Sequence, residues 1–281
     1  MSVSIKYRLG KSAAFKTMVI ILAFMITLPL LFIIGYIFKA GISTINWHFL
    51  VNVPKPVGEF GGGIANALIG SLIIVAVAAV IAIPIGILCG IYLSENKTAK
   101  LAYWSRLAVD ILQGVPSIVI GIVVYFWAVK PLGGFSALSG SIALAIMMLP
   151  IVIRSTEETL KLLPDSLKEA ALALGIPYHR VILSVIVPCG ISGILSGVIL
   201  SIARIAGETA PLLFTAFGSP FITGDLRKPM ASLPWLIFNY ATSPYAEWRN
   251  LAWGASLILL TWVLLLNIFT KVITRKWKIQ L

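Results

Sequence analysis

Six long runs without a charged residue constrain this chain more than any other feature of its sequence. A helix needs about 20 apolar residues, at 1.5 Å rise each, to cross the hydrocarbon core of a bilayer. Only 11% of the 281 residues are charged, against about 25% in soluble domains. We therefore expect an all-α, polytopic helical bundle in a lipid bilayer. The six predicted transmembrane helices cover residues 17–38, 64–94, 111–129, 131–153, 181–203 and 251–270.

The net charge of +12 fits a membrane protein better than a nucleic-acid-binding one, and no nucleic-acid partner is expected. The basic residues lie mostly in the gaps between apolar runs, and cytoplasmic loops are enriched in Lys and Arg. With the amino terminus in the cytoplasm, 15 basic residues fall inside and six outside. Both termini are then cytoplasmic, which requires an even number of spans. The inner set is Lys6, Arg8, Lys11, Lys16, Lys97, Lys100, Arg106, Arg154, Lys161, Lys168, Arg180, Lys271, Arg275, Lys276 and Lys278; the outer set is Lys39, Lys55, Lys130, Arg227, Lys228 and Arg249.

Two regions decide how the chain is divided into parts. The first run follows basic residues as a signal peptide does, but it has no small-residue cleavage pattern before Lys39, so a retained helix is expected. Residues 1–63 then form a basic tail, a first helix and an outer loop, and residues 64–281 form a core of five helices. Residues 209–246 are broken by glycines and prolines. We expect them to extend the fifth helix and to form a short outer helix, with a re-entrant segment as the alternative.

The loop at residues 163–188 is predicted to lie inside, between the fourth and fifth spans. Ser166 and Glu169 form an S-x-x-E capping box, and Gly175 is a natural helix stop, which predicts a helix of about two turns. Its apolar residues share one face, and Lys168 and Glu169 lie off it. Such a helix suits docking into a groove of another protein; lying flat on the membrane surface is the alternative. The face consists of Leu167, Ala170, Ala171 and Leu174.

This loop resembles the EAA---G loop of ABC importer permeases. Glu169, Ala170 and Ala171 are followed after three residues by Gly175, and Pro188 stands in register with the proline that ends the family motif. The resemblance implies that Glu169, Ala170, Ala171, Leu174 and Gly175 form a coupling helix, which docks on an ATP-binding subunit. The chain has no phosphate-binding loop of its own, because Ile5 stands where the first glycine before Gly10-Lys11-Ser12 belongs. ATP hydrolysis would come from a partner.

Arg204 and Glu208 interrupt apolar sequence that continues on both sides of them. A charge at mid-bilayer costs about 2.5–3.5 kcal/mol on insertion scales, and such residues usually face the bundle interior or a watery path. If the fifth helix starts near Gly190, however, Arg204 lies about 21 Å along it, in the outer half. The alternative is a salt bridge near the outer surface, with the arginine reaching water. An arginine suits phosphate and other oxyanions, and the carboxylate would hold it in place.

The segment at residues 204–216 resembles the R-x-x-G-E-T-A-P-L segment of phosphate-importer permeases of the PstA type. Permeases of the sister PstC type share R-x-x-G-E-T and then differ. The resemblance implies that Arg204, Glu208 and Thr209 belong to the path of inorganic phosphate. Arg154 is a second candidate, with a positive-inside anchor as the favoured alternative. Further matching segments are residues 62–64, 83–86, 92–95, 114–117 and 149–150.

We therefore predict a permease subunit of a type I ABC importer for phosphate in the cytoplasmic (inner) membrane. The resemblance implies a PstC-type sister permease, two copies of an ATP-binding subunit and a periplasmic or extracellular phosphate-binding protein. No catalytic residue, cofactor or metal site is expected, since two histidines and two cysteines are too few and too scattered. The alternatives are a permease for another oxyanion, such as sulfate or molybdate, and an ATP-independent channel or secondary transporter.

Overall fold

A computed structural model describes residues 5–59 and 61–276, and within these residues it contains helices and no strand. Five helical stretches are long and apolar enough to cross a membrane, and a bent pair makes six if it counts as one span. The prediction of an all-α bundle is confirmed. The five stretches are α1 (Ile5–Gly41), α3 (Ala65–Glu95), α6 (Ala137–Lys161), the continuous α8 (Tyr178–Val181), η2 (Ile182–Ile186) and α9 (Val187–Ala206), and α12 (Ala246–Lys276).

The bent pair replaces the single helix that was predicted for residues 111–129. Here α4 (Lys100–Gly114) meets α5 (Ser117–Val124) and η1 (Tyr125–Val129) at an angle of 106°. Pro116 explains the break, because it lacks an N–H and disfavours the helical conformation of the residue before it. The next helix also begins later than residue 131. A loop through Gly133, whose φ is 80°, precedes the start of α6 at Ala137.

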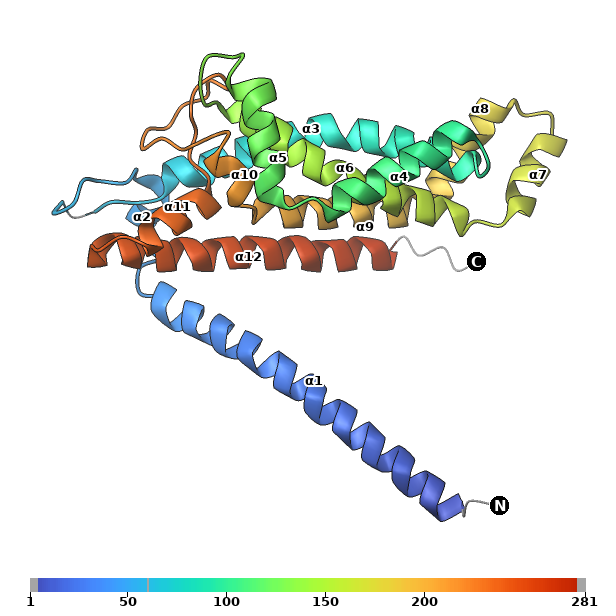
Figure 1. The fold of residues 1–281 in the computed structure, drawn as a ribbon, viewed down its shortest axis with the longest axis horizontal. Coiled ribbons are helices and arrows are strands. Elements are labelled where there is room, and N and C mark those ends of the chain that lie inside the picture. The colour runs from blue at the N-terminus through green and yellow to red at the C-terminus, as the bar shows by residue number, and fades with distance from the viewer. Residues whose placement is uncertain (1–4, 60, 277–281) are drawn as a thin grey trace.

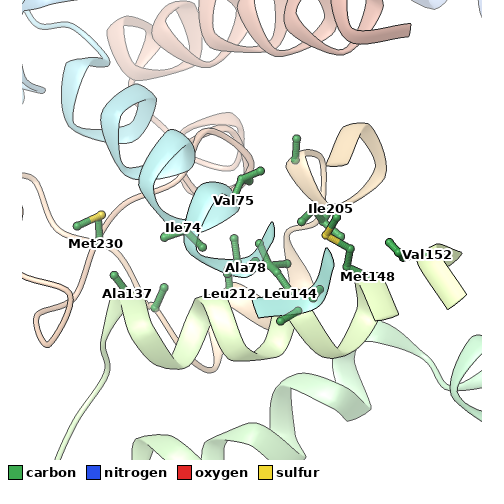
Figure 2. Close-up of a cluster of buried hydrophobic side chains, with 14 of the residues drawn as sticks. Ile74, Val75, Ala78, Ala137, Leu144, Met148, Val152, Ile205, Leu212 and Met230 are labelled. Carbon is green, nitrogen blue, oxygen red and sulfur yellow. The ribbon is translucent and has the colours of Figure 1, made fainter. Parts of the chain in front are cut away.

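The core lies where α3 and α6 face each other. Figure 2 shows Ile74 and Ala78 from α3 pointing toward Leu144 and Met148 of α6. In the most apolar part of α6, 61% of the residues are buried, the largest share among the five long helical stretches. This helix is therefore the central one, with α3 and α9 packed on it.

Glycines of α3 and α9 let α6 approach both of these neighbours closely. A Cβ on Gly90 of α3 would lie 2.5 Å from the Cβ of Thr156. A Cβ on Gly197 of α9 would lie 1.9 Å from the Oγ of Ser155. Both distances are too short for any side chain, so these glycines permit backbone-level packing between helices.

The elements are divided between two ends of the molecule. Figure 1 shows α7 (Asp165–Ala173) and α8 at one end, and α2 (Trp47–Val51) and α11 (Leu233–Ala241) at the other. The start of α1 and the end of α12 lie toward the α7 end. The α1 helix leans away from the bundle and meets α12 only near its own carboxyl end, where Tyr36 contacts Trp253.

The segment after α9 differs from the prediction in one respect. The fifth helix does not extend through residues 211–217, because α9 ends at Ala206 and a separate short helix, α10 (Ala210–Leu213), follows Gly207. Pro211 cannot continue the hydrogen-bond ladder of the preceding helix. The short helix that was predicted within residues 209–246 is present as α11.

Candidate functional site

A cavity of about 570 Å³ lies between α6 and α9 and reaches the end of α4. Its volume falls in the range of small-molecule sites. Two arginines line it, Arg154 from α6 and Arg204 from α9, together with one carboxylate, Glu158. The wall is therefore net positive. The remaining lining residues are Gln113, Ile151, Ser155, Thr159, Leu162, Ser196, Gly197 and Leu200.

Arg204 lies deeper in the bundle than its place along the fifth helix indicated. It also lines a small adjoining niche with Met147, Pro150 and Val115. Met147 and Pro150 are near the midpoint of α6, and Val115 stands at the α4–α5 break. The guanidinium is thus level with the middle of the central helix, and its side chain is 60% exposed. This exposed charge lines the wall of the cavity.

Glu208 is a loose partner for Arg204. The Arg204 Nε and Glu208 Oε1 are 4.0 Å apart, the Glu208 side chain is half-buried, and the carboxylate follows the end of α9. Thr209 is also half-buried and precedes the first residue of α10. The structure brings Arg204 into the cavity wall, whereas Glu208 and Thr209 are not among its lining residues.

Arg154 lies within α6 and its charge is already matched. It contacts Asp110 of α4 and donates from Nη1 to Oε2 of Glu157 over 3.0 Å. Glu157 is fully buried and also accepts from Arg106 over 2.7 Å and from Lys161 over 2.6 Å. We call these five residues the Glu157 cluster. A buried carboxylate needs such partners, because a lone charge in a low-dielectric interior is very costly.

Arg106 connects the Glu157 cluster to the end of α3. Its Nη2 donates to the carbonyl oxygen of Leu93 over 2.6 Å and to that of Asn96 over 3.3 Å. These are among the carbonyls that the last turn of a helix leaves without a helical partner. One guanidinium thus joins α3, α4 and α6.

Glu157 was not recognised from the sequence. Its neighbours Arg154 and Lys161 stand three residues before and four residues after it, so a helical spacing of charges did mark the position. That signal was hidden because the span was placed at residues 131–153, which leaves Glu157 in a loop. Nothing in the local sequence indicates the contact with Arg106.

The predicted helix of the inner loop is present as α7, but the capping box is wrong. The residue before the helix is Pro164, and no side chain caps the first turn. Pro164 interrupts the helical conformation after α6. The helix α7 then begins at Asp165, so Ser166 lies inside its first turn. The predicted stop is confirmed, since Gly175 has a φ of 75°, in the left-handed region that favours glycine.

The faces of α7 also differ from the predicted stripe. Ala171 is buried and Leu167 half-buried, and both pack with Val181 and Ile182. Ala170 and Leu174 are exposed together with Glu169 and Gly175, and Leu174 is 80% exposed. These four residues therefore belong to the outward side of α7 that is available to a partner.

Lys168 points inward instead of lying off the packed face. Its Nζ contacts the Glu95 carboxylate at the end of α3, and the Tyr178 hydroxyl contacts the same carboxylate. Lys168 also donates to the Tyr178 hydroxyl over 3.0 Å. Burial lowers the pKa of Lys168, but the hydrogen bonds to Glu95 and Tyr178 outweigh it, so the pKa is raised above 10.5. We call these three residues the Glu95 cluster.

Comparison with protein families gives one match over most of the chain. Residues 82–279 match the family described as "Binding-protein-dependent transport system inner membrane component". The matched region includes α7 and both arginines of the cavity.

Individual relatives are similar over still longer stretches. The phosphate transport system permease protein PstA of Yersinia pestis is 48% identical over 239 residues, covering 85% of this chain and 81% of the relative. The PstA protein of Mycobacterium leprae is 40% identical over 276 residues, covering 95% and 89%.

Among solved structures, a chain of the MetNI methionine ABC transporter in an inward facing conformation has a TM-score of 0.65. The match covers 76% of this chain and 96% of that one at 18% identity, and supports the fold alone.

Proposed function

The chain belongs to the family of binding-protein-dependent transport system inner membrane components, and from this premise we propose that it is the permease subunit of an ATP-driven importer of inorganic phosphate. As a member of that family it is a multi-pass protein of the inner membrane. Its relatives at 40–48% identity, which bear the name of phosphate transport permeases, support phosphate as the substrate.

The position of Arg204 in the cavity wall is the observation that supports the proposal most directly. It combines a planar fork of donors, which matches phosphate oxygens, with a place in a cavity of about 570 Å³ at the level of mid-α6. Its carboxylate partner is 4.0 Å away, so an arriving anion does not have to displace a tight ion pair.

Glu208 and Thr209 would act around Arg204 in different ways. The Glu208 carboxylate keeps the empty site close to neutral and weakens anion binding, which allows release. Thr209 stands next to it at the start of α10 and would belong to the same anion path. Transport requires such moderate affinity, because an anion that binds too tightly is not released.

The remaining subunits follow from the same proposal. A PstC-type sister permease would complete the pathway, two ATP-binding subunits would supply hydrolysis, and a phosphate-binding protein would deliver the anion from outside. The outward face of α7, formed by Glu169, Ala170, Leu174 and Gly175, would dock on one ATP-binding subunit. Ala171 would hold the helix to its own chain.

Uptake by proteoliposomes tests the substrate and the energy source together. The chain is co-purified with its partners, reconstituted with the binding protein outside, and supplied with labelled phosphate. We expect import that requires internal ATP and is not reduced by excess sulfate or molybdate. Competition by either anion would favour the rival oxyanion permease. Import without ATP, or purification without an ATPase, would favour a channel or secondary transporter.

Gly175→Trp tests the docking of α7. A Cβ at Gly175 meets no other atom within 4 Å, so the added ring projects into open space where the ATP-binding subunit would lie. We expect ATP hydrolysis to continue while import stops. Gly175→Ala is the matched control, because its Cβ brings the same strain at a φ of 75° without the bulky ring. Unchanged coupling in the Trp variant would contradict docking at this face.

Cysteine labelling tests the proposed orientation, with both termini and α7 in the cytoplasm. Cys89 is exposed, so the test uses a chain in which Cys89 and Cys189 are replaced by alanine. Tyr178→Cys should then react with an impermeant thiol reagent only from the cytoplasmic side. Labelling from outside would show that the orientation is the reverse of the one proposed.

A further inference from the structure

We propose that Lys168 and Tyr178, acting through Glu95, are positioning residues that transmit the movement of α7 to the cavity between α6 and α9. The inference rests on the proposed function, since it concerns how ATP-driven movement reaches the substrate. It assigns a role to the Glu95 cluster, which lies outside both the outward face of α7 and the cavity wall.

The first link joins α7 to the end of α3. Lys168 comes from α7, Tyr178 from the first turn of α8, and both contact one carboxylate, Glu95, the last residue of α3. The Lys168 ammonium also lies 4.7 Å from the centre of the Tyr178 ring. Apolar packing supports the same junction, because Ile87 and Ile91 of α3 pack against the cluster that contains Ala171.

The position of Glu95 is unfavourable for α3 itself. The carboxyl end of a helix carries a partial negative charge, which disfavours a carboxylate there. Lys168 compensates for that cost, and its side chain is 25% exposed while that of Glu95 is 15% exposed. The pair thus makes α3 depend on the position of α7.

The second link runs from the end of α3 to the cavity. Arg106 binds the carbonyl oxygens of Leu93 and Asn96, which flank Glu95 along the chain. It also binds Glu157, which in turn binds Arg154 in the cavity wall. Polar contacts therefore run from Lys168 to Arg154, with the backbone at the end of α3 joining Glu95 to the two carbonyl oxygens.

The same junction contains a natural control. Lys97, two residues after the end of α3, lies 3.8 Å from Asp165 of α7, but their side chains are 62% and 78% exposed. Exposed ion pairs contribute little, about 0–1 kcal/mol. Asp165→Asn should therefore leave coupling unchanged, although it removes a charge from the same helix.

The experiment measures phosphate imported per ATP hydrolysed, in proteoliposomes that contain the complete complex. Glu95→Gln, Lys168→Met and Tyr178→Phe are compared with Asp165→Asn and wild type. We expect ATP hydrolysis to persist while the import ratio falls about 2- to 30-fold for Glu95→Gln and Lys168→Met, the usual range for coupling variants. The fall for Tyr178→Phe should be smaller, because the Lys168–Glu95 pair remains.

Rescue variants separate transmission from simple loss of folding. Lys168→Arg keeps the charge and should keep most of the coupling. The charge exchange Glu95→Lys with Lys168→Glu restores an opposite-charge pair and should recover coupling that either single change loses. Failure of both rescues, with equal amounts of assembled complex, would overturn the proposal. So would wild-type coupling in Lys168→Met.

A readout that does not depend on phosphate distinguishes this inference from the proposed function. Leu200→Cys, in a chain with Cys89→Ala and Cys189→Ala, reports access to the cavity wall. In the wild-type background, trapping the ATP-bound state should change its labelling rate, and Lys168→Met should abolish that change. Failed phosphate import with this response intact would overturn only the proposed substrate. A full response in Lys168→Met would overturn the inference.

Discussion

Two charged sites of the bundle, the Glu157 cluster and the Arg204–Glu208 pair, differ in how completely their charges are matched. Glu157 is fully buried and holds three cations within 3.0 Å. Arg204 is 60% exposed and stands 4.0 Å from one carboxylate. A charge with all partners in place stabilises the fold, whereas a charge with a loose partner beside a cavity is available to a ligand.

The largest effect expected from this comparison is that of Glu157→Ala. It leaves Arg106, Arg154 and Lys161 without their shared partner. Breaking a buried pair costs about 3–5 kcal/mol, and partial exposure of the cations places this case at the lower end. Thermal unfolding and the yield of assembled complex in detergent should both fall. Wild-type stability would show that the cluster is not structural.

Arg204→Gln should leave assembly intact and nearly abolish phosphate uptake. Each hydrogen bond to a charged group contributes about 1.5–3 kcal/mol, so import should fall roughly 10- to 150-fold. Uptake in vesicles, normalised to assembled complex, measures the loss. Arg204→Lys keeps the charge without the planar fork of donors, so its uptake should lie between that of wild type and that of Arg204→Gln. Normal uptake in the glutamine variant would remove Arg204 from the pathway.

Arg154→Gln should have a weaker effect on uptake, although Arg154 lines the same cavity. Asp110 and Glu157 already engage its guanidinium, so only part of its charge reaches the cavity. We expect a two- to fivefold decrease, equivalent to about 0.5–1 kcal/mol. A loss as large as that of Arg204→Gln would mean that both arginines bind the anion equally.

Asp110→Asn should produce the smallest change, in the opposite direction. Its side chain is 55% exposed, so removing its charge should cost under about 1 kcal/mol of stability. Arg154 then loses one of its two carboxylates and faces the cavity with more free charge. The concentration of phosphate that gives half-maximal uptake should decrease. An increase would contradict the view that Asp110 competes with the anion.

The sequence predicted the fold class and the general position of five helices, because charge-free runs must be buried in lipid whatever their tertiary contacts. The break at Pro116 was not predicted, because apolar sequence continues across it. The 31 residues of α3 exceed one span, and the excess is explained by the structure. At 1.5 Å per residue the helix is about 46 Å long, longer than a hydrocarbon core of about 30 Å. Its last residue is Glu95, which contacts Lys168 of α7.

The sites were predictable only where the local pattern holds the information. Arg204 stood out because it interrupts an apolar run. Lys168 did not, since its partner Glu95 is distant in sequence. Glu157 was missed because the fourth span was ended at residue 153, although Arg154 and Lys161 mark it at helical spacing. The roles predicted for Arg204, Glu208 and Thr209, and for the α7 residues, remain predictions until the variants are measured.

The glycine contacts of α6 limit how this permease can move. Ser155 and Thr156 are adjacent, and they fit against Gly197 of α9 and Gly90 of α3. Adjacent residues of the central helix α6 therefore pack closely on α3 and on α9. The helix cannot slide along either neighbour without separating from it. We expect α3, α6 and α9 to tilt as a single rigid body during a transport cycle. Bending should then be confined to the segments that lack such contacts, the α4–α5 break at Pro116 and the turn at Gly207.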